Sequence, residues 1–215
     1  MAKKLLSILL ALTLMLGLLP AASITASGAA TEFSDMPNNW ATEALKSAVA
    51  NGLLTGYEGK IMPDNPVTRA QLAAIITRAF GATEEGDISS YSDLKGVADW
   101  VAVSFARAFK MGVMQGSGGK IEPNSNITRE EAFTVLARAL KLEPAAYAII
   151  NFDDADQVSY WAKGYINALI NAGYLKGSNG KLDPKANISR AQFAQIMYNI
   201  IKQYINVAGE YTKVA

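Results

Sequence analysis

Three arginines give the clearest sign of chemistry in this sequence, because each follows a hydroxyl residue at the expected start of a helix. They are Arg69, Arg129 and Arg190, preceded by Thr68, Thr128 and Ser189. The first turn of a helix has unpaired N–H groups and a partial positive charge, which disfavours a cation by about 0.3–1 kcal/mol. A bound anion, held by the guanidinium and the backbone N–H groups, would explain a cation placed there three times. Alternatively, each arginine pairs with an acid, the candidates being Asp35, Asp93 and Asp154.

The residue types that are missing exclude several classes of enzyme. The chain has no Cys and no His, which rules out a Ser-His-Asp triad, a thiol nucleophile, disulfides and zinc sites built on these side chains. A glycosidase with two carboxylates is the remaining enzymatic alternative. No acidic pair stands apart from the repeated pattern, so we expect no catalytic residues. The run Asp153-Asp154-Ala155-Asp156 lacks EF-hand spacing and its glycine, so we expect no metal site and no cofactor.

The N-terminus and the overall charge indicate where the protein works. Lys3 and Lys4 precede an apolar stretch from Leu5 to Leu19, and small residues follow Pro20. This pattern predicts a secretory signal peptide over residues 1–30, with an uncleaved membrane anchor as the alternative. The mature chain would carry 18 basic and 19 acidic residues, so we expect no nucleic-acid partner. No second apolar segment could span a membrane, so we expect an exported protein without a membrane span after cleavage.

The remainder of the chain consists of three repeats of one sequence unit. Trp40, Trp100 and Trp161 each lie 29 residues before one of the three arginines. Gly56, Gly116 and Gly177 each lie 13 residues before the same arginine, and every unit opens with an aromatic-x-Asp motif. We place the repeats at residues 31–88, 89–149 and 150–204. Residues 205–215 form a C-terminal tail, which is either a disordered end or the first strand of a further domain.

The sequence of each unit predicts a helix, a glycine-containing hairpin-like loop and a second helix. Apolar residues recur at helical spacing from each Trp, and Gly52, Gly112 and Gly173 stand where left-handed C-terminal caps are expected. The loop glycines suggest positive φ and close backbone approach. The second helix begins with the capping box S/T-x-x-E/Q. One amphipathic pair of this size cannot bury its apolar face alone, so we expect three units around a shared core.

The tryptophans allow two interpretations. The favoured one is that each anchors the first helix of its unit in the core. The other is that they belong to a glycan-binding surface, as exported repeats with aromatic residues and glycine loops can provide.

These motifs resemble the S-layer homology domain, which usually occurs as a triplet in exported bacterial proteins. The matching segments in the first unit are Phe33-Ser34-Asp35, Trp40-Ala41, Gly52-Leu53-Leu54-Thr55-Gly56-Tyr57, Pro63 and Val67-Thr68-Arg69-Ala70-Gln71. The resemblance implies a mainly α fold, in which three helix-loop-helix repeats form a compact pseudo-threefold assembly with grooves between neighbouring units. It also implies non-covalent anchoring to the cell wall through secondary cell wall polysaccharide, often carrying pyruvate ketals on N-acetylmannosamine. The pyruvyl carboxylate would be the anion that the arginines require.

The family's Thr-Arg-Ala-Glu motif places the binding arginine at the three repeated positions, with two departures. Gln71 and Gln192 replace Glu at the fourth position, where only Glu131 matches. Glu130 replaces Ala beside Arg129 and could compete with an anionic ligand, so we expect that groove to be the least effective. The alternative function is a structural or protein-binding envelope module whose arginines are in ion pairs. Possible partners therefore include S-layer proteins as well as wall polysaccharide.

The candidate ligand-binding residues form five sets, each with one member in every unit. They are Arg69, Arg129 and Arg190; Thr68, Thr128 and Ser189; Asp35, Asp93 and Asp154; Trp40, Trp100 and Trp161; and Gly56, Gly116 and Gly177.

Overall fold

The computed structural model describes residues 33–146 and 151–211, with side chains described up to residue 200. Its helices are α2 (Thr42–Ala50), α3 (Arg69–Ala79), α4 (Asp99–Lys110), α5 (Arg129–Ala139), α6 (Tyr160–Asn171) and α7 (Arg190–Tyr211). Short 3-10 turns cover Ser92–Leu94 and Ala155–Gln157. Within the described residues β-pairing is limited to isolated bridges. The predicted signal peptide lies outside the described residues, whereas residues 205–211 of the predicted tail continue helix α7.

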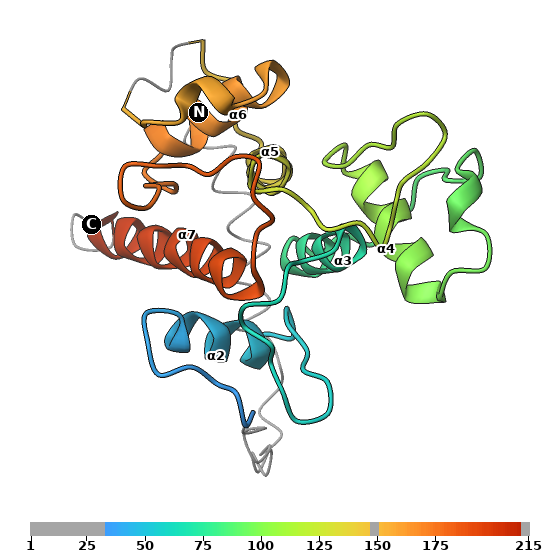
Figure 1. Ribbon diagram of the computed structural model, residues 1–215, viewed down its shortest axis with the longest axis horizontal. Helices are drawn as coiled ribbons and strands as arrows, with labels where there is room; N and C mark the ends of the chain where they lie inside the picture. The colour runs from blue at the N-terminus through green and yellow to red at the C-terminus, as the bar shows by residue number, and fades with distance from the viewer. Residues whose placement is uncertain (1–32, 147–150, 212–215) are drawn as a thin grey trace.

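The helices form a three-lobed assembly in which the second helix of each unit packs against the first helix of a neighbouring unit. The second helix of each unit (α3, α5, α7) lies near the centre, and the first helices (α2, α4, α6) lie outside them (Figure 1). Helix α3 packs against α4, α5 packs against α6, and α7 closes the circle against α2. The fold is therefore mainly α and pseudo-threefold, as predicted. Each packed helix pair, however, combines helices of two neighbouring units of the circle rather than the two helices of one unit.

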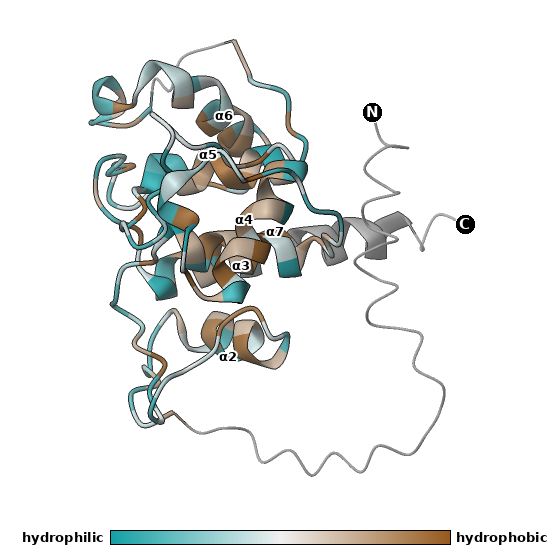
Figure 2. Cartoon of the chain, turned by 90° about the vertical axis from the view of Figure 1, so that its right-hand side faces the viewer, coloured by the Kyte–Doolittle hydropathy of each residue, from teal (hydrophilic) through white to brown (hydrophobic). Residues whose placement is uncertain are grey.

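One apolar core joins the three lobes, and the tryptophans are not part of it. Leu45, Phe105 and Ile166, each five residues after a Trp, are fully buried. The indoles of Trp40, Trp100 and Trp161 are 61%, 48% and 49% exposed. The prediction of tryptophan core anchors is therefore wrong. Each Trp stands at the beginning of its helix, where it faces solvent, while the residue about a turn and a half later enters the core. Figure 2 shows apolar faces meeting inside the assembly and polar residues along the loops.

The helix ends follow the local sequence signals. Thr68 accepts a hydrogen bond from the backbone N–H of Gln71 at 3.2 Å, and the Gln71 side chain accepts from the Thr68 N–H at 3.1 Å. The same reciprocal pair occurs between Thr128 and Glu131 and between Ser189 and Gln192. The predicted glycine caps after the first helices are also confirmed, with φ values of 66°, 72° and 76° at Gly52, Gly112 and Gly173.

A closed ring of backbone hydrogen bonds ties the units together at the centre. The N–H of Ile127 donates to the carbonyl of Val67 at 2.9 Å, that of Ile188 to Ile127 at 3.1 Å, and that of Val67 to Ile188 at 2.9 Å. All three residues are completely buried. Because each residue both donates and accepts, no unit can leave the ring without stranding a buried N–H and a buried carbonyl.

Candidate functional site

Each repeated arginine reaches across the interface into the following unit. The guanidinium Nε–H donates to a loop carbonyl there: Arg69 to Ile121 at 2.7 Å, Arg129 to Leu182 at 2.7 Å, and Arg190 to Ile61 at 2.8 Å. Arg129 and Arg190 are buried, whereas the side chain of Arg69 is 15% exposed. Burial lowers the pKa of Arg190, and the nearby Asp35 carboxylate partly opposes this effect. The repeated arginines thus connect neighbouring units.

The N–H groups at the helix start are not available to an anion. In α3 the backbone N–H of Arg69 donates to the carbonyl of Ser125 at 2.9 Å, and that of Ala70 to Pro123 at 3.0 Å. The third N–H is taken by the Thr68 hydroxyl. Helices α5 and α7 repeat this pattern with the loops of the third and first units. The expectation that guanidinium and backbone N–H converge on one anion is therefore wrong for the backbone part, because the neighbouring loop already occupies these donors.

The repeated aspartates hold the same loops from the opposite side. Asp35 accepts from the N–H of Ile61 at 2.6 Å and of Met62 at 2.8 Å, while Arg190 takes the carbonyl of Ile61. Asp93 and Asp154 bind their own loops in the same way. Among the described residues no Asp of this set forms an ion pair with a repeated arginine. The arginine and the aspartate therefore do not pair directly. Each forms its own hydrogen bonds to the same loop residue, the arginine to its carbonyl and the aspartate to its N–H.

The paired N–H groups stabilise an unusual backbone conformation and the charge of the aspartates. Met62, Glu122 and Asp183 adopt φ values of 52°, 56° and 48°, which are uncommon for residues other than glycine. Burial alone would raise the pKa of Asp154, but the N–H groups of Leu182 and Asp183 lower it below its ordinary value. The pKa of Asp35 and of Asp93 is lowered by the same combination.

The repeated loop glycines make room for the aromatic residue that opens each unit. A Cβ on Gly56 would lie 2.0 Å from the ring of Phe33, and on Gly116 it would lie 2.3 Å from the ring of Tyr91. Gly177 meets Phe152 at 2.4 Å. The expected close approach is therefore confirmed at all three positions. Of these three glycines only Gly177 has a positive φ, with a value of 65°. The expected positive φ is also found at other glycines of the same loops: 71° at Gly59, 58° at Gly118, 73° at Gly119 and 73° at Gly180.

One groove between units gathers several of the candidate residues. Its volume is about 230 Å³, and we call it the Arg69 groove. Arg69 comes from the first unit, Gln115 and Glu131 from the second, and Trp161 from the third. The remaining lining residues are Val113, Met114, Ile127, Thr134, Val135 and Arg138. Pockets for drug-sized ligands measure roughly 300–1,000 Å³, so this groove suits a smaller group such as one sugar ring.

The fourth position of the capping box also contributes to the groove. The Arg69 guanidinium contacts the Glu131 carboxylate at 3.4 Å and the carbonyl of Gln115 at 3.0 Å. In the next interface Arg129 donates to the side-chain oxygen of Gln192 at 3.2 Å. Gln192 thus retains the hydrogen bond from the arginine but lacks the negative charge of Glu131, and both Gln71 and Gln192 leave the helix start intact.

A second arginine of this groove was missed in the sequence. Glu131, Thr134, Val135 and Arg138 lie on one face of α5 at helical spacing and line the groove together. The guanidinium of Arg138 lies 4.9 Å from the centre of the Tyr165 ring on α6. A signal was present, because Arg78 and Arg138 both lie nine residues after a repeated arginine. The third unit has Asn199 at that place, so the pattern is incomplete.

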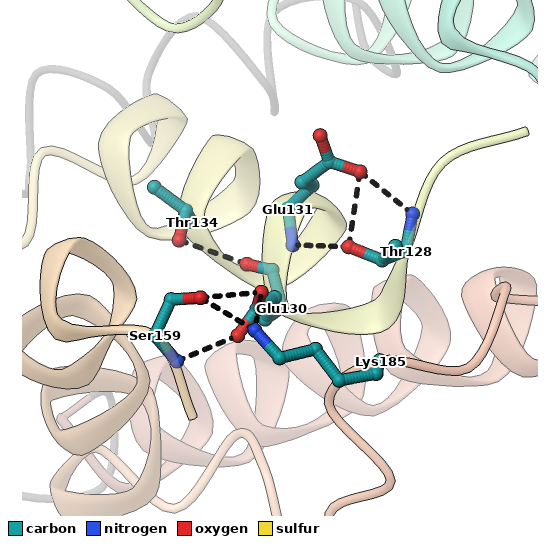
Figure 3. Close-up of polar contacts among 6 residues, drawn as sticks. All are labelled: Thr128, Glu130, Glu131, Thr134, Ser159 and Lys185. Atoms are coloured by element: carbon teal, nitrogen blue, oxygen red, sulfur yellow. Dashed lines mark hydrogen bonds and ion pairs between the residues drawn. The ribbon is translucent and has the colours of Figure 1, made fainter. Parts of the chain in front are cut away.

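Glu130 does not compete for the ligand of Arg129. Figure 3 shows its carboxylate directed toward Ser159 and Lys185. It accepts from the Ser159 N–H at 2.9 Å, from the Ser159 hydroxyl at 2.9 Å and from Lys185 Nζ at 2.6 Å. The prediction that Glu130 weakens the groove of Arg129 is therefore not supported by the contacts. The carboxylate instead holds the beginning of α6, whose own first turn contains no acid.

Comparison with known proteins identifies the family to which this chain belongs. The model of the S-layer homology domain matches three segments, residues 32–73, 90–133 and 151–194. The chain therefore belongs to the S-layer homology domain family, whose members are cell-wall anchoring modules. This membership places the chain in general terms among secreted, wall-associated proteins of the bacterial cell surface.

Similar proteins include both surface-layer proteins and enzymes. The surface-layer 125 kDa protein of Lysinibacillus sphaericus is 33% identical over 86% of this chain, which spans 16% of that protein. The S-layer protein sap of Bacillus anthracis is 27% identical over 83% of the chain, spanning 22% of that protein. An amylopullulanase of Thermoanaerobacterium thermosulfurigenes is 29% identical over 81% of the chain and 10% of the enzyme. The chain thus corresponds to a minor part of each relative.

None of the helices in residues 33–146 and 151–211 is both long enough and apolar enough to cross a membrane. In the described part of the chain no three acidic side chains gather closely enough to hold a metal ion.

Proposed function

We propose that this chain anchors a protein to the bacterial cell wall by binding secondary cell wall polysaccharide, with a pyruvylated amino sugar seated in the grooves between units. The observation that carries the proposal is the Arg69 groove, where two guanidinium groups and a half-exposed indole line one small cavity. Guanidinium groups bind carboxylates through charge-assisted hydrogen bonds. An exposed indole provides a flat apolar surface on which the less polar face of a sugar ring can pack.

A second cavity does not suit an anion. It has a volume of about 330 Å³ and lies between the segment Glu85–Ser89 and helix α4. Glu85 and Asp87 line it, and no basic residue does. An acidic ligand would be repelled there, so the groove between units is the better candidate.

The first test compares two neighbouring aromatic residues at the start of α6. Trp161→Ala should abolish or strongly reduce co-sedimentation of the mature chain with purified cell walls, because it removes the indole of the groove. Tyr160→Ala is the matched control, since Tyr160 is 93% exposed and does not line the groove. Equal binding by the two variants, with unchanged melting temperatures, would contradict the proposed site.

The second test concerns the anion. Calorimetric titration with wall polysaccharide, before and after chemical removal of its pyruvyl groups, should show binding only to the pyruvylated polymer. Replacing Arg69, Arg129 and Arg190 by Ala, singly and together, should reduce affinity by about ten- to 150-fold for each arginine that bonds the ligand. Since each arginine also bonds a neighbouring loop, thermal melting must accompany every titration. Undiminished binding by a folded triple variant would refute a mechanism based on the three repeated arginines.

A second function has support from a specific contact. Arg69 and Glu131 form an ion pair at 3.4 Å, and every repeated arginine bonds a loop carbonyl. A structural or protein-binding envelope module would use the arginines in this way alone. Binding to an S-layer protein without binding to isolated polysaccharide would favour this alternative.

A further inference from the structure

The two arginines of the Arg69 groove differ in how many of their hydrogen-bond donors are already in use. All three nitrogens of Arg69 donate to protein oxygens. The acceptors are the carbonyls of Ile121 and Gln115 and the carboxylate of Glu131. The carboxylate also offsets the positive charge of the guanidinium. Three of its five N–H groups are therefore in use and its charge is partly offset, which leaves two N–H groups for an incoming carboxylate.

Arg138 lies in the same groove with its donors unused. Its guanidinium stacks on the ring of Tyr165 at 4.9 Å, and within the described residues its side chain has no hydrogen bond or ion pair to another group. It is partly exposed and lines the cavity. Its charge and its N–H groups are thus available to a ligand that enters the groove.

The stacking on Tyr165 also orients the guanidinium. A cation–π contact holds the planar group over the ring face and leaves its edge free for two parallel hydrogen bonds to a carboxylate. Trp161 lies one helical turn before Tyr165 on α6 and lines the same cavity. One helix therefore supplies both the aromatic support for the arginine and the aromatic surface for a sugar ring.

The geometry points to Arg138 as a second residue, beside Arg69, that binds the carboxylate of a wall sugar in the Arg69 groove. This inference rests on the proposed function and names a further group that recognises the acid. The ligand class is a single hexose bearing a carboxylate close to its ring.

The test requires a readout of this groove alone. The chain has three tryptophans, so its indole N–H signals in an NMR spectrum can be assigned with Trp→Phe variants, and the signal of Trp161 reports the Arg69 groove. The probes are N-acetylmannosamine with a pyruvyl ketal and the methyl ester of the same sugar. The two probes share their shape and differ in the negative charge.

The wild-type chain should bind the acid more tightly than the ester, as measured at Trp161. Arg138→Met should weaken binding of the acid by about ten- to 150-fold, the range for charged hydrogen bonds, while binding of the ester stays close to that of the wild type. Its melting temperature should change little, since no hydrogen bond is removed. Arg138→Lys should keep much of the preference for the acid, because the charge remains.

Arg69→Met should behave differently, because it should lower the melting temperature as well as the preference for the acid, since its guanidinium also holds the loop carbonyl of Ile121. If Arg69→Met does not fold, the comparison of Arg138→Met with Arg138→Lys still tests the inference. A wild-type preference for the acid in Arg138→Met would overturn the inference. Wall sedimentation without any preference for the acid at Trp161 would overturn it too, but would leave the proposed function standing. Absence of both wall sedimentation and probe binding would refute the proposed function as well.

Discussion

Replacing Glu130 by Ala should destabilise the mature chain by about 2 kcal/mol, a value obtained from opposing contributions. The carboxylate accepts two hydrogen bonds from Ser159 and one from Lys185. Hydrogen bonds to a charged group contribute about 1.5–3 kcal/mol each, but burial of a carboxylate that is 5% exposed offsets much of the sum. Lys185 is 53% exposed, so water can solvate its ammonium group once Glu130 is gone.

Lys185→Ala should be at least as destabilising as Glu130→Ala. It leaves a buried carboxylate without a cation, and only Ser159 and the beginning of α6 then stabilise the charge. In the double variant no buried charge remains, so its loss of stability should be close to that of Glu130→Ala alone. The two substitutions are therefore expected to be strongly non-additive.

Urea unfolding of the mature chain and the three variants measures these differences through linear extrapolation. The chain provides its own control for the substitution, because Ala70 and Ala191 occupy the equivalent positions of α3 and α7. A loss below about 0.5 kcal/mol for Glu130→Ala, which is the range of ordinary surface substitutions, would refute the reasoning. Additive losses in the double variant would show that Glu130 and Lys185 act independently.

Three further predictions address the aspartates, the glycines and the tryptophans. The folded-state pKa of Asp154 is lowered, so its ionised carboxylate stabilises the fold above the unfolded pKa of about 3.9, and this stabilisation is lost as pH falls through the folded value. Asp154→Asn should therefore reduce the fall in melting temperature below about pH 4. Gly116→Ala should be more destabilising than Gly112→Ala, because its Cβ would lie 2.3 Å from the Tyr91 ring and 2.6 Å from the Lys120 carbonyl oxygen, whereas Gly112→Ala costs only the roughly 1–2 kcal/mol of a left-handed alanine; equal urea midpoints would contradict this. Trp100→Ala should destabilise far less than Phe105→Ala, for which about 3–5 kcal/mol is expected, because the indole is 48% exposed and the phenyl ring is fully buried.

The helices could be predicted because their signals are local. A capping box such as Thr68 with Gln71 needs only four consecutive residues, and a glycine cap such as Gly52 needs only the end of one helix. The helical period shows that an apolar face exists but does not name the surface that covers it. For this reason the sequence could not show that α3 packs against α4 rather than against α2.

The candidate site could be predicted only in part for a similar physical reason. Spacing identified Arg69 and Trp161, but their meeting in one groove depends on the exchange of helices between units. Burial of Trp161 was expected from its apolar character, whereas its place at the first turn of α6 leaves it half exposed. Glu130 was assigned to the wrong neighbour because its partners Ser159 and Lys185 lie 29 and 55 residues away along the chain.

The position of the repeated arginines connects assembly of the fold with formation of the grooves. A cation at the first position of a helix is unfavourable within that helix. Side chains there lean toward the helix start, where the neighbouring loop lies, and Arg69 thereby reaches the carbonyl of Ile121. A guanidinium can donate from Nε to that carbonyl and from its outer nitrogens to the groove, which the single ammonium of Lys cannot do in a fixed geometry. The repeated arginines therefore hold neighbouring units together, and Arg69 also lines a groove, so a loss of binding in an arginine variant identifies a ligand contact only when the assembly remains intact.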